Sequence, residues 1–268
     1  MVETSAKAIS TDLLGSYCRL KVELEQEITV LPGQFAMLKP MATLEPLLRR
    51  AMAFYDVCSS HGRTYAEFIF RILGRGTQAL AAVKPGDEVA FLGPLGKPFD
   101  LRPAIGHKAL LVGGGIGTPA LYLLAKALVA CNIPTTAVLG ARSLADLVAV
   151  EDFANICTTI LTTDDGSAGH KGLVTEVVAE LLDQNSGCVV YTCGPEVMMA
   201  KVAELATNHK AACYVSMEAR MACGFGVCVG CVVETMTSTA GCSDSSTETD
   251  YVRVCIEGPV FDARVVVW

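Results

Sequence analysis

Three cysteines stand close together near the end of the chain, in the stretch "MACGFGVCVGC" at residues 221–231. Cys223, Cys228 and Cys231 have the spacing C-x4-C-x2-C, and further cysteines follow downstream. This spacing with a distant fourth thiolate is typical of a plant-type [2Fe–2S] site, in which four thiolates hold two irons. The loop contains glycines that accept positive φ and let backbone N–H groups face the sulfurs, namely Gly224, Gly226 and Gly230.

Two downstream cysteines compete for the place of fourth ligand. Cys242 stands in the polar stretch "TMTSTAGCSDSSTETD", whereas Cys255 stands in the apolar, strand-like run "YVRVCIEGPVF". A rigid, dry position suits a cluster ligand, so the sequence favours Cys255, with Cys242 as the alternative. Structural zinc is the other metal to weigh, but it usually takes a second Cys pair or His residues, and none stands nearby. Plain buried thiols are the third interpretation.

A second group of residues has types suited to a nucleotide. The stretch "LLVGGGIGTPAL" joins a predicted strand to a predicted helix, where glycines permit a tight turn and a close approach of phosphate to backbone N–H groups. The glycines concerned are Gly113, Gly114, Gly115 and Gly117. The full G-x-G-x-x-G motif is absent, so an ordinary α/β turn is the alternative.

Two further stretches end predicted strands, where ligands of open α/β sheets bind. "YTCGPE" contains Cys193, Gly194, Pro195 and Glu196. "TTDDG" contains Asp164 and Asp165, which could also simply begin a turn. We predict that Cys193 belongs to the site rather than to the core.

A third candidate site combines "RRAMAF" at residues 49–54 with "FRILGRGT" at residues 70–77. Arg50 could neutralise a phosphate, and Gly76 with Thr77 could offer N–H and hydroxyl donors. Arg49 and Arg50 could equally be a solvated basic pair.

The elements that position these residues fall into three parts. Residues 1–102 show short apolar runs separated by turn signals such as "LPG", "HGR" and "KPG", which indicates an antiparallel β-barrel. In residues 103–210, apolar strands alternate with helices, which predicts an α/β domain with a parallel sheet. Residues 211–268 contain the cysteines and form a small C-terminal cluster domain in this interpretation.

Composition limits the possible classes of protein. Of 268 residues, 51% are hydrophobic and 18% charged, which favours large cores over disorder. A net charge of −7 disfavours a nucleic-acid partner. We expect no membrane span, because glycines, Pro119 and Lys126 interrupt the most apolar stretch. The start has no signal-peptide pattern, and 12 cysteines without one predict a reducing, cytoplasmic location.

Taken together, the motifs resemble one family over nearly the whole chain. "MEARMACGFGVCVGC" followed by "CIEGPVFDA", with "LLRRAMAF", "GRGT", "GGGIGTPAL", "TDDGSAGHKG" and "CGPEVMM" in this order, is similar to the electron-transfer subunits of NAD-dependent (class B) dihydroorotate dehydrogenases. That family belongs to the ferredoxin-NADP-reductase-like group. The resemblance implies an oxidoreductase subunit that relays electrons between NAD(H) and a partner through FAD and a [2Fe–2S] cluster.

The resemblance also implies site residues. FAD is expected at Arg50, Ala51, Met52, Ala53, Ile69, Phe70, Arg71, Gly76 and Thr77. NAD(H) is expected at the glycine turn and at Cys193–Glu196, and the cluster at Cys223, Cys228, Cys231 and Cys255. The implied partner is an FMN-containing catalytic subunit that oxidises dihydroorotate to orotate in pyrimidine synthesis, in a heterotetramer with two of each. No catalytic acid, base or nucleophile is then needed in this chain.

Two departures from the family pattern stand out. The family usually has Arg-Pro-x-Ser/Thr where this chain has "RAMA", so Ala53 lacks a hydroxyl for the flavin and Ala51 lacks a stiff proline ring. The segment between Cys231 and Cys255 also looks longer than usual, which keeps Cys242 as an alternative ligand. Arg142 and Ser143, after "LGA", could meet the 2′-phosphate of NADP or form a solvated turn.

Other functions fit parts of the same pattern. A similar flavin and iron–sulfur subunit could serve a hydrogenase, a sulfide or polysulfide reductase, or a ferredoxin:NADP transhydrogenase. From another class, a non-catalytic iron–sulfur sensing module could have lost its flavin, with "RAMA" as the trace of that loss. Flavin absorption that NADH bleaches would separate the relay from the sensor.

Overall fold

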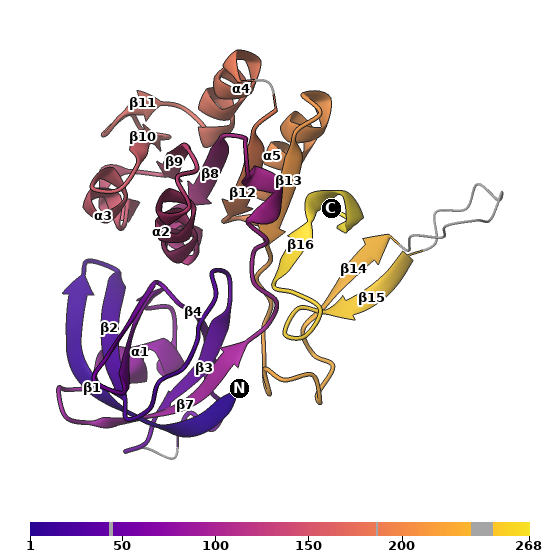
Figure 1. The fold of residues 1–268 in the computed structure, drawn as a ribbon. Helices are drawn as coiled ribbons and strands as arrows, with labels where there is room; N and C mark the ends of the chain where they lie inside the picture. Colours follow the sequence, from indigo (N-terminus) through magenta and orange to yellow (C-terminus); the bar gives the residue numbers. More distant parts are fainter. Residues whose placement is uncertain (43–44, 186, 237–248) are drawn as a thin grey trace.

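The chain forms two large sheets and a small C-terminal hairpin (Figure 1). This computed structural model describes residues 1–42, 45–185, 187–236 and 249–268. The first sheet lies in the lower lobe of Figure 1 and the second in the upper lobe. The C-terminal segment lies beside both lobes, with the hairpin projecting outward.

The first sheet is antiparallel throughout and curves into a half-barrel. Its strand order is β4-β3-β7-β1-β2-β6-β5. Inside the curve, the rings of Phe54 and Phe68 have centroids 5.1 Å apart, and Phe91 joins them. The elements are β1 (Val2–Leu14), β2 (Tyr17–Leu24), β3 (Phe35–Pro40), β4 (Arg50–Ala53), β5 (Asp56–Ser60), β6 (Arg63–Arg71), α1 (Arg75–Ala81) and β7 (Glu88–Leu95).

The second sheet is parallel except for its last strand, and its order is β11-β10-β9-β8-β12-β13-β16. Successive residues of each strand point to opposite faces, as in Leu110 and Leu111 of β8, which belong to different core clusters. The strands are β8 (Ala109–Gly114), β9 (Thr135–Ala141), β10 (Thr158–Thr163), β11 (His170–Lys171), β12 (Val189–Cys193), β13 (Ala212–Ser216) and β16 (Val260–Asp262).

Helices cover both faces of this sheet, as the near-continuous apolar strands predict. One face packs against α4 (Val174–Gln184) and α5 (Glu196–Asn208), and the other against α2 (Tyr122–Ala130) and α3 (Val150–Ala154). A 3-10 turn at Gly115–Leu121 links β8 to α2. The hairpin consists of β14 (Val232–Met236) and β15 (Thr249–Arg253). No helix of the described part of the chain has the length and hydrophobicity needed to span a bilayer.

The structure corrects several sequence-based expectations. Strand β1 and the short helices α1 and α3 were not predicted. The run "AMAFYDVCS" is two strands rather than one, because Phe54 and Tyr55 turn inward between β4 and β5. The run around Cys255 is not one strand: it is β15, a turn over residues 254–257, and then β16, which pairs antiparallel with β13.

Candidate functional site

The cysteine-rich segment at residues 221–231, the thiol loop, and Cys255 together place four thiols as two pairs. Cys223 Sγ lies 3.4 Å from Cys228 Sγ near the surface. Cys231 and Cys255 are both buried, and the thiol of one interacts with that of the other. Burial, followed by the Cys231 thiol, raises the pKa of Cys255 to about 12. Burial alone would also raise the pKa of Cys223, but backbone N–H groups of the loop, Cys228 first, lower it to about 6.

This arrangement fits a two-iron cluster. Across the described residues, no three His, Cys, Asp or Glu side chains group around a single point as one metal ion needs. Two thiol pairs suit two irons, each held by two thiolates, so the donor set fits [2Fe–2S] chemistry. The N–H of Cys228 points at Cys223 Sγ from 3.5 Å, the kind of backbone contact that tunes a cluster. Cys242 lies outside the described residues.

The loop bends at residues with positive φ. Gly224 has φ +81° and Gly226 has φ +90°, as expected. Gly230 does not take positive φ; the left-handed residue beside it is Val229, at φ 52°. The expectation for Gly230 was therefore wrong, and a Cβ there would make an ordinary contact with Cys228 Sγ at 3.6 Å, so this position does not require glycine.

The thiol loop lies against the half-barrel. A Cβ built on Gly224 would lie 2.5 Å from Met37 Cγ on β3, so only glycine permits this approach. Met37 pairs with Ala51 of β4, inside the predicted flavin motif. The backbone N–H of Lys97 also bonds the carbonyl of Gly258, which fixes the C-terminal segment to the end of the half-barrel. The loop therefore packs next to the expected flavin site.

The predicted flavin residues are partly brought together. The guanidinium of Arg50 lies directly over Gly76, in space that a Cβ would occupy. Its Nη1 also donates to the carbonyl of Leu48 at 2.8 Å. The hydroxyl of Thr77 caps the start of α1 instead, because it bonds both the N–H and the carbonyl of Gly74. Ala51 and Ala53 are half-buried on β4, with Met52 buried between them.

The remaining predicted flavin residues alternate along β6. Ile69 is buried in the cluster that joins the two sheets, and Phe70 is buried in the half-barrel core. Arg71 lines a large cavity together with Tyr17, its partner on β2.

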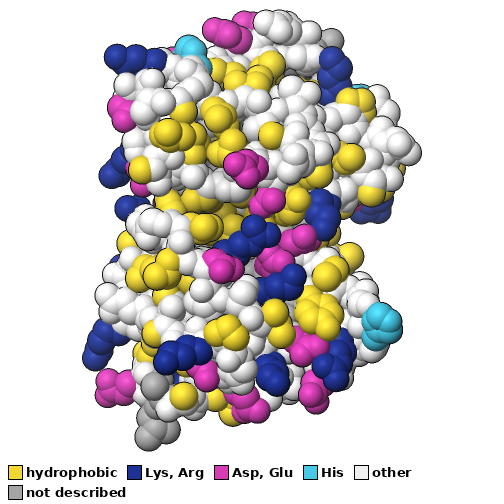
Figure 2. Space-filling model, turned by 90° about the vertical axis from the view of Figure 1, so that its left-hand side faces the viewer, with side chains coloured by type: hydrophobic (Ala, Val, Ile, Leu, Met, Phe, Trp, Pro, Cys, Tyr) yellow, Lys and Arg dark blue, Asp and Glu magenta, His cyan; other side chains and the backbone are white. Residues whose placement is uncertain are grey.

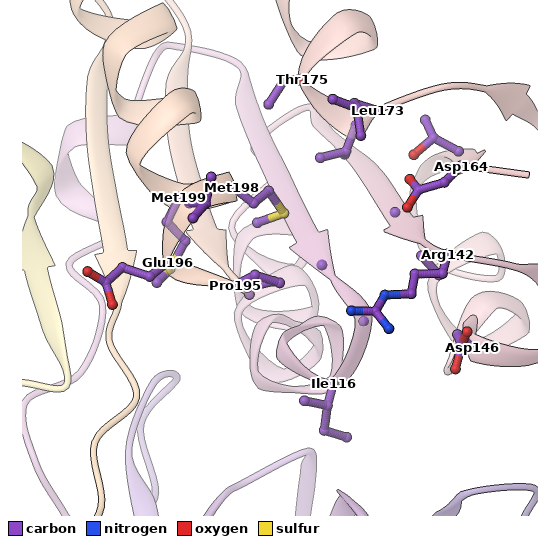
Figure 3. A pocket seen from close by; sticks show the side chains of 18 of the residues that line it. Ile116, Arg142, Asp146, Asp164, Leu173, Thr175, Pro195, Glu196, Met198 and Met199 are labelled. Carbon is purple, nitrogen blue, oxygen red and sulfur yellow. The ribbon is translucent and has the colours of Figure 1, made fainter. Parts of the chain in front are cut away.

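That cavity has a volume of about 780 Å³ and lies at the carboxyl ends of β8, β9, β10 and β12 (Figure 3). Such strand ends are the usual ligand position in open α/β sheets. Of the predicted nucleotide residues, Gly114, Gly115, Gly194, Pro195 and Glu196 line it. In Figure 3, Met198, Pro195, Ile116 and the Arg142 side chain surround the open space. Its size suits a nucleotide.

The other predicted nucleotide residues do not line the cavity, but they shape the turn and the strand that form its wall. A Cβ on Gly117 would lie 2.5 Å from the backbone of Cys193, and one on Gly113 would meet Thr118. These glycines let the turn pack closely on β12. The side chain of Cys193 is buried, and burial with the Glu218 charge raises its pKa. Its thiol therefore does not line the cavity.

Several lining residues were not singled out from the sequence. They include Tyr17, Asp146, Lys201, Met217 and Glu218. Tyr17 comes from the other sheet, and Met217 with Glu218 directly follows β13, so only the fold brings them here. A sequence signal for Glu218 was its position just after a strand, where ligands of open α/β sheets bind.

The two lobes meet through a mixed polar and aromatic junction. Figure 2 shows apolar side chains in the hollow between them, with Lys, Arg, Asp and Glu side chains across the junction. Arg19 of β2 contacts Glu67 at 2.6 Å and Asp152 of α3 at 3.3 Å. Tyr55 stacks on Tyr122 of α2 at 4.7 Å, and its hydroxyl donates to Asp152. These contacts hold the two lobes together and so position the cavity residues that each lobe contributes.

A curved antiparallel sheet, a parallel sheet with a ligand-sized cavity and a terminal thiol loop define a ferredoxin-reductase-like protein with an iron–sulfur domain. A solved structure of an NADH-dependent reduced ferredoxin-NADP oxidoreductase is similar, with TM-score 0.81, 26% identity and coverage of 98% of this chain and 90% of that chain. A family model described as the iron-sulfur cluster binding domain of dihydroorotate dehydrogenase B matches residues 218–267.

Relatives that match over most of their own length narrow this class to one family. A protein of Bacillus caldolyticus named "Dihydroorotate dehydrogenase B (NAD(+)), electron transfer subunit" is 42% identical, covering 93% of this chain and 90% of its own. A protein of Aquifex aeolicus (strain VF5), named as a homolog of that subunit, is 38% identical over 100% of this chain and 99% of its own. This chain belongs to the family of dihydroorotate dehydrogenase B electron transfer subunits. The predicted family, fold class and cofactors, FAD, [2Fe–2S] and NAD(H), are confirmed.

Proposed function

We propose that this chain relays electrons between NAD(H) and an FMN-containing dihydroorotate dehydrogenase subunit in pyrimidine synthesis. The observation that carries the proposal is the contact of the thiol loop with β3, one strand from the flavin motif on β4. The nucleotide cavity opens beside the same lobe, since Tyr17 and Arg71 of the half-barrel line it. Flavin, when bound, supplies the exchange between a hydride and single electrons.

The residues of this chain hold and position the cofactors. Arg50, over Gly76, places a positive charge where a flavin phosphate can bind. Gly114, Gly115 and Gly194 leave the cavity wall open to a dinucleotide. Cys223, Cys228, Cys231 and Cys255 hold the cluster in this proposal.

The partner would dock over the thiol loop. Phe225, Val227 and Val229 are 41%, 73% and 57% exposed, and Ile256 adds to the same rim. Apolar side chains exposed around a redox centre favour a protein partner that covers them. We propose that this partner oxidises dihydroorotate to orotate in a cytoplasmic heterotetramer with two of each chain.

The proposal is tested by mixing the anaerobically purified chain with an FMN-type dihydroorotate dehydrogenase subunit from the same source. We expect a stable complex in which dihydroorotate reduces NAD⁺, a reaction that neither chain performs alone. A chain that reduces dyes with NADH yet neither binds that subunit nor supports this reaction would refute the assigned partner.

One observation favours a second candidate, a relay to another acceptor. The similar solved structure belongs to an NADH-dependent reduced ferredoxin-NADP oxidoreductase and covers nearly the whole chain. Reduction of ferredoxin by NADH and the purified chain, without the dihydroorotate-oxidising subunit, would support this candidate.

A further inference from the structure

The β9–β10 end of the nucleotide cavity carries charged side chains that bear on the choice between NAD(H) and NADP(H). The two dinucleotides differ only by a phosphate on the adenosine ribose. Arg142, just after β9, and Asp164, just after β10, both line the cavity. The inference below rests on the proposed function, because it concerns the nucleotide of that reaction.

The position of the thiol loop indicates which end of the cavity would receive adenosine. The nicotinamide must meet the flavin, and the flavin must lie near the thiol loop. That loop follows β13, and Met217 and Glu218 at the end of β13 line the cavity beside β12. Since β9 and β10 lie on the opposite side of β8 from β12, they are left for the adenosine half.

Arg142 and Asp164 are direct neighbours across two parallel strands. The last register pair is Ala141 with Thr163, and the chains stay joined beyond it, because the N–H of Asp164 bonds the carbonyl of Ala141 at 3.1 Å. Nevertheless, none of the ion pairs within 4.0 Å in the described part of the chain includes Arg142. In Figure 3 this guanidinium extends into the cavity, with Asp164 on one side and Asp146 on the other.

The hydroxyl that could help Arg142 to bind a phosphate is already engaged. Ser143 Oγ donates to Asp146 Oδ2 at 3.2 Å. Arg142 and Ser143 together would suit a 2′-phosphate. Because Ser143 is bonded to Asp146, Arg142 instead lies between two carboxylates, those of Asp146 and Asp164. A carboxylate repels the two charges of a phosphate but accepts hydrogen bonds from the two hydroxyls of an unmodified ribose.

We propose that Asp164, supported by Asp146, selects NAD(H) by repelling a 2′-phosphate from Arg142. The whole cavity has the same bias. Three cations line it, Arg71, Arg142 and Lys201, against four carboxylates, Asp146, Asp164, Glu196 and Glu218. An additional phosphate therefore enters a wall without surplus positive charge.

The test compares Asp164→Asn with a matched control, Asp165→Asn, in the flavin-loaded chain. The carboxylate of Asp165 accepts hydrogen bonds from Ser167 N and Oγ at 2.9 and 2.6 Å and does not line the cavity. We expect Asp164→Asn to raise kcat/KM for NADPH relative to NADH by about ten-fold in flavin-dependent dye reduction. Asp165→Asn should leave this ratio unchanged.

A second pair of variants tests the role of Arg142. Asp146→Asn combined with Asp164→Asn should raise the NADPH preference further, and Arg142→Ala in the Asp164→Asn chain should remove the gain. Unchanged preference in Asp164→Asn, or an equal change in Asp165→Asn, overturns the inference while leaving the relay intact. Equal kcat/KM values for NADH and NADPH in the unmodified chain would also overturn the inference and leave the relay intact. If neither nucleotide reduces the flavin, the proposed function fails with it.

Discussion

At the scale of single residues, the proposed cluster site consists of four thiols in two environments. Cys223 and Cys228 are near the surface, whereas Cys231 and Cys255 are buried. Burial raises the pKa of Cys255 to about 12, whereas for Cys223 burial is outweighed by the backbone N–H groups of the loop, that of Cys228 first, which lower the pKa to about 6. Metal binding requires deprotonated thiols, so in the proposed site Cys255 gains more than Cys223 from the positive charge of iron. The exposed pair is the side from which a partner can approach.

Replacing one exposed cysteine of the proposed cluster site should separate the two redox centres. We predict that Cys228→Ser prevents assembly of the cluster and reduces electron delivery to a partner by at least about ten-fold, because a [2Fe–2S] cluster needs all four thiolates. NADH-to-dye activity through the flavin should largely remain. Iron and acid-labile sulfide assays with both activities measure this.

Cys58→Ser is the control, because Cys58 is an exposed, free cysteine on β5 of the half-barrel. It should change neither iron content nor activity. Full cluster content in Cys228→Ser would exclude Cys228 as a ligand.

At the scale of elements, the site is built where strands end and glycines allow close packing. The cysteine spacing, the glycine turn and the strand-ending motifs were readable from the sequence because each depends on local residues. Strand β1 could not be predicted from the sequence, because its inward-facing residues include the small alanines Ala6 and Ala8 and most of its other residues are polar. The cavity position of Tyr17 and the burial of Cys193 depend on how distant elements pack, which local patterns do not encode.

The turn after β8 offers a test at this scale. We predict that Gly117→Ala raises KM for NADH by about ten-fold or lowers stability by about 1–3 kcal/mol, because its Cβ would meet the backbone of Cys193 and Gly194 at 2.5 Å. Steady-state kinetics and thermal unfolding together detect either effect.

Gly74→Ala is the matched control. Gly74 is extended, at φ −170°, and a Cβ there meets no heavy atom within 4 Å. It should leave KM for NADH unchanged. Equal behaviour of the two variants would show that the close packing on β12 does not shape the cavity.

At the scale of the whole molecule, function requires the two lobes and the thiol loop to keep a fixed arrangement. Arg19 bridges Glu67 of its own lobe and Asp152 of the other. Burial alone would raise the pKa of Glu67, but hydrogen bonds from Lys21 and Arg19 hold it below its usual range. Glu67 therefore stabilises the folded chain when ionised, above its unfolded pKa of about 4.3, and this contribution is lost as pH falls through the folded pKa.

Removing this charge should loosen the junction. We predict that Glu67→Gln lowers the free energy of unfolding by about 1–3 kcal/mol at neutral pH, because charged hydrogen bonds to Arg19 and Lys21 are lost. The difference from the unmodified chain should shrink below about pH 4.3. Denaturant unfolding at matched pH values measures it.

Glu88→Gln, at an exposed position that begins β7, serves as control and should change stability little. A constant difference between Glu67→Gln and the unmodified chain at all pH values would contradict the assigned role of the Glu67 charge.

In the proposed relay, electrons pass between nicotinamide and the thiol-held cluster by way of the flavin. The most direct measurement is anaerobic titration of the purified, flavin- and iron-loaded chain with NADH, followed by visible and electron paramagnetic resonance spectroscopy. We predict that the flavin bleaches and that the signal of a reduced [2Fe–2S] cluster then appears, and that this signal is absent when the chain has been stripped of flavin. A cluster that stays oxidised while the flavin is fully reduced, or one that NADH reduces without flavin, would contradict it.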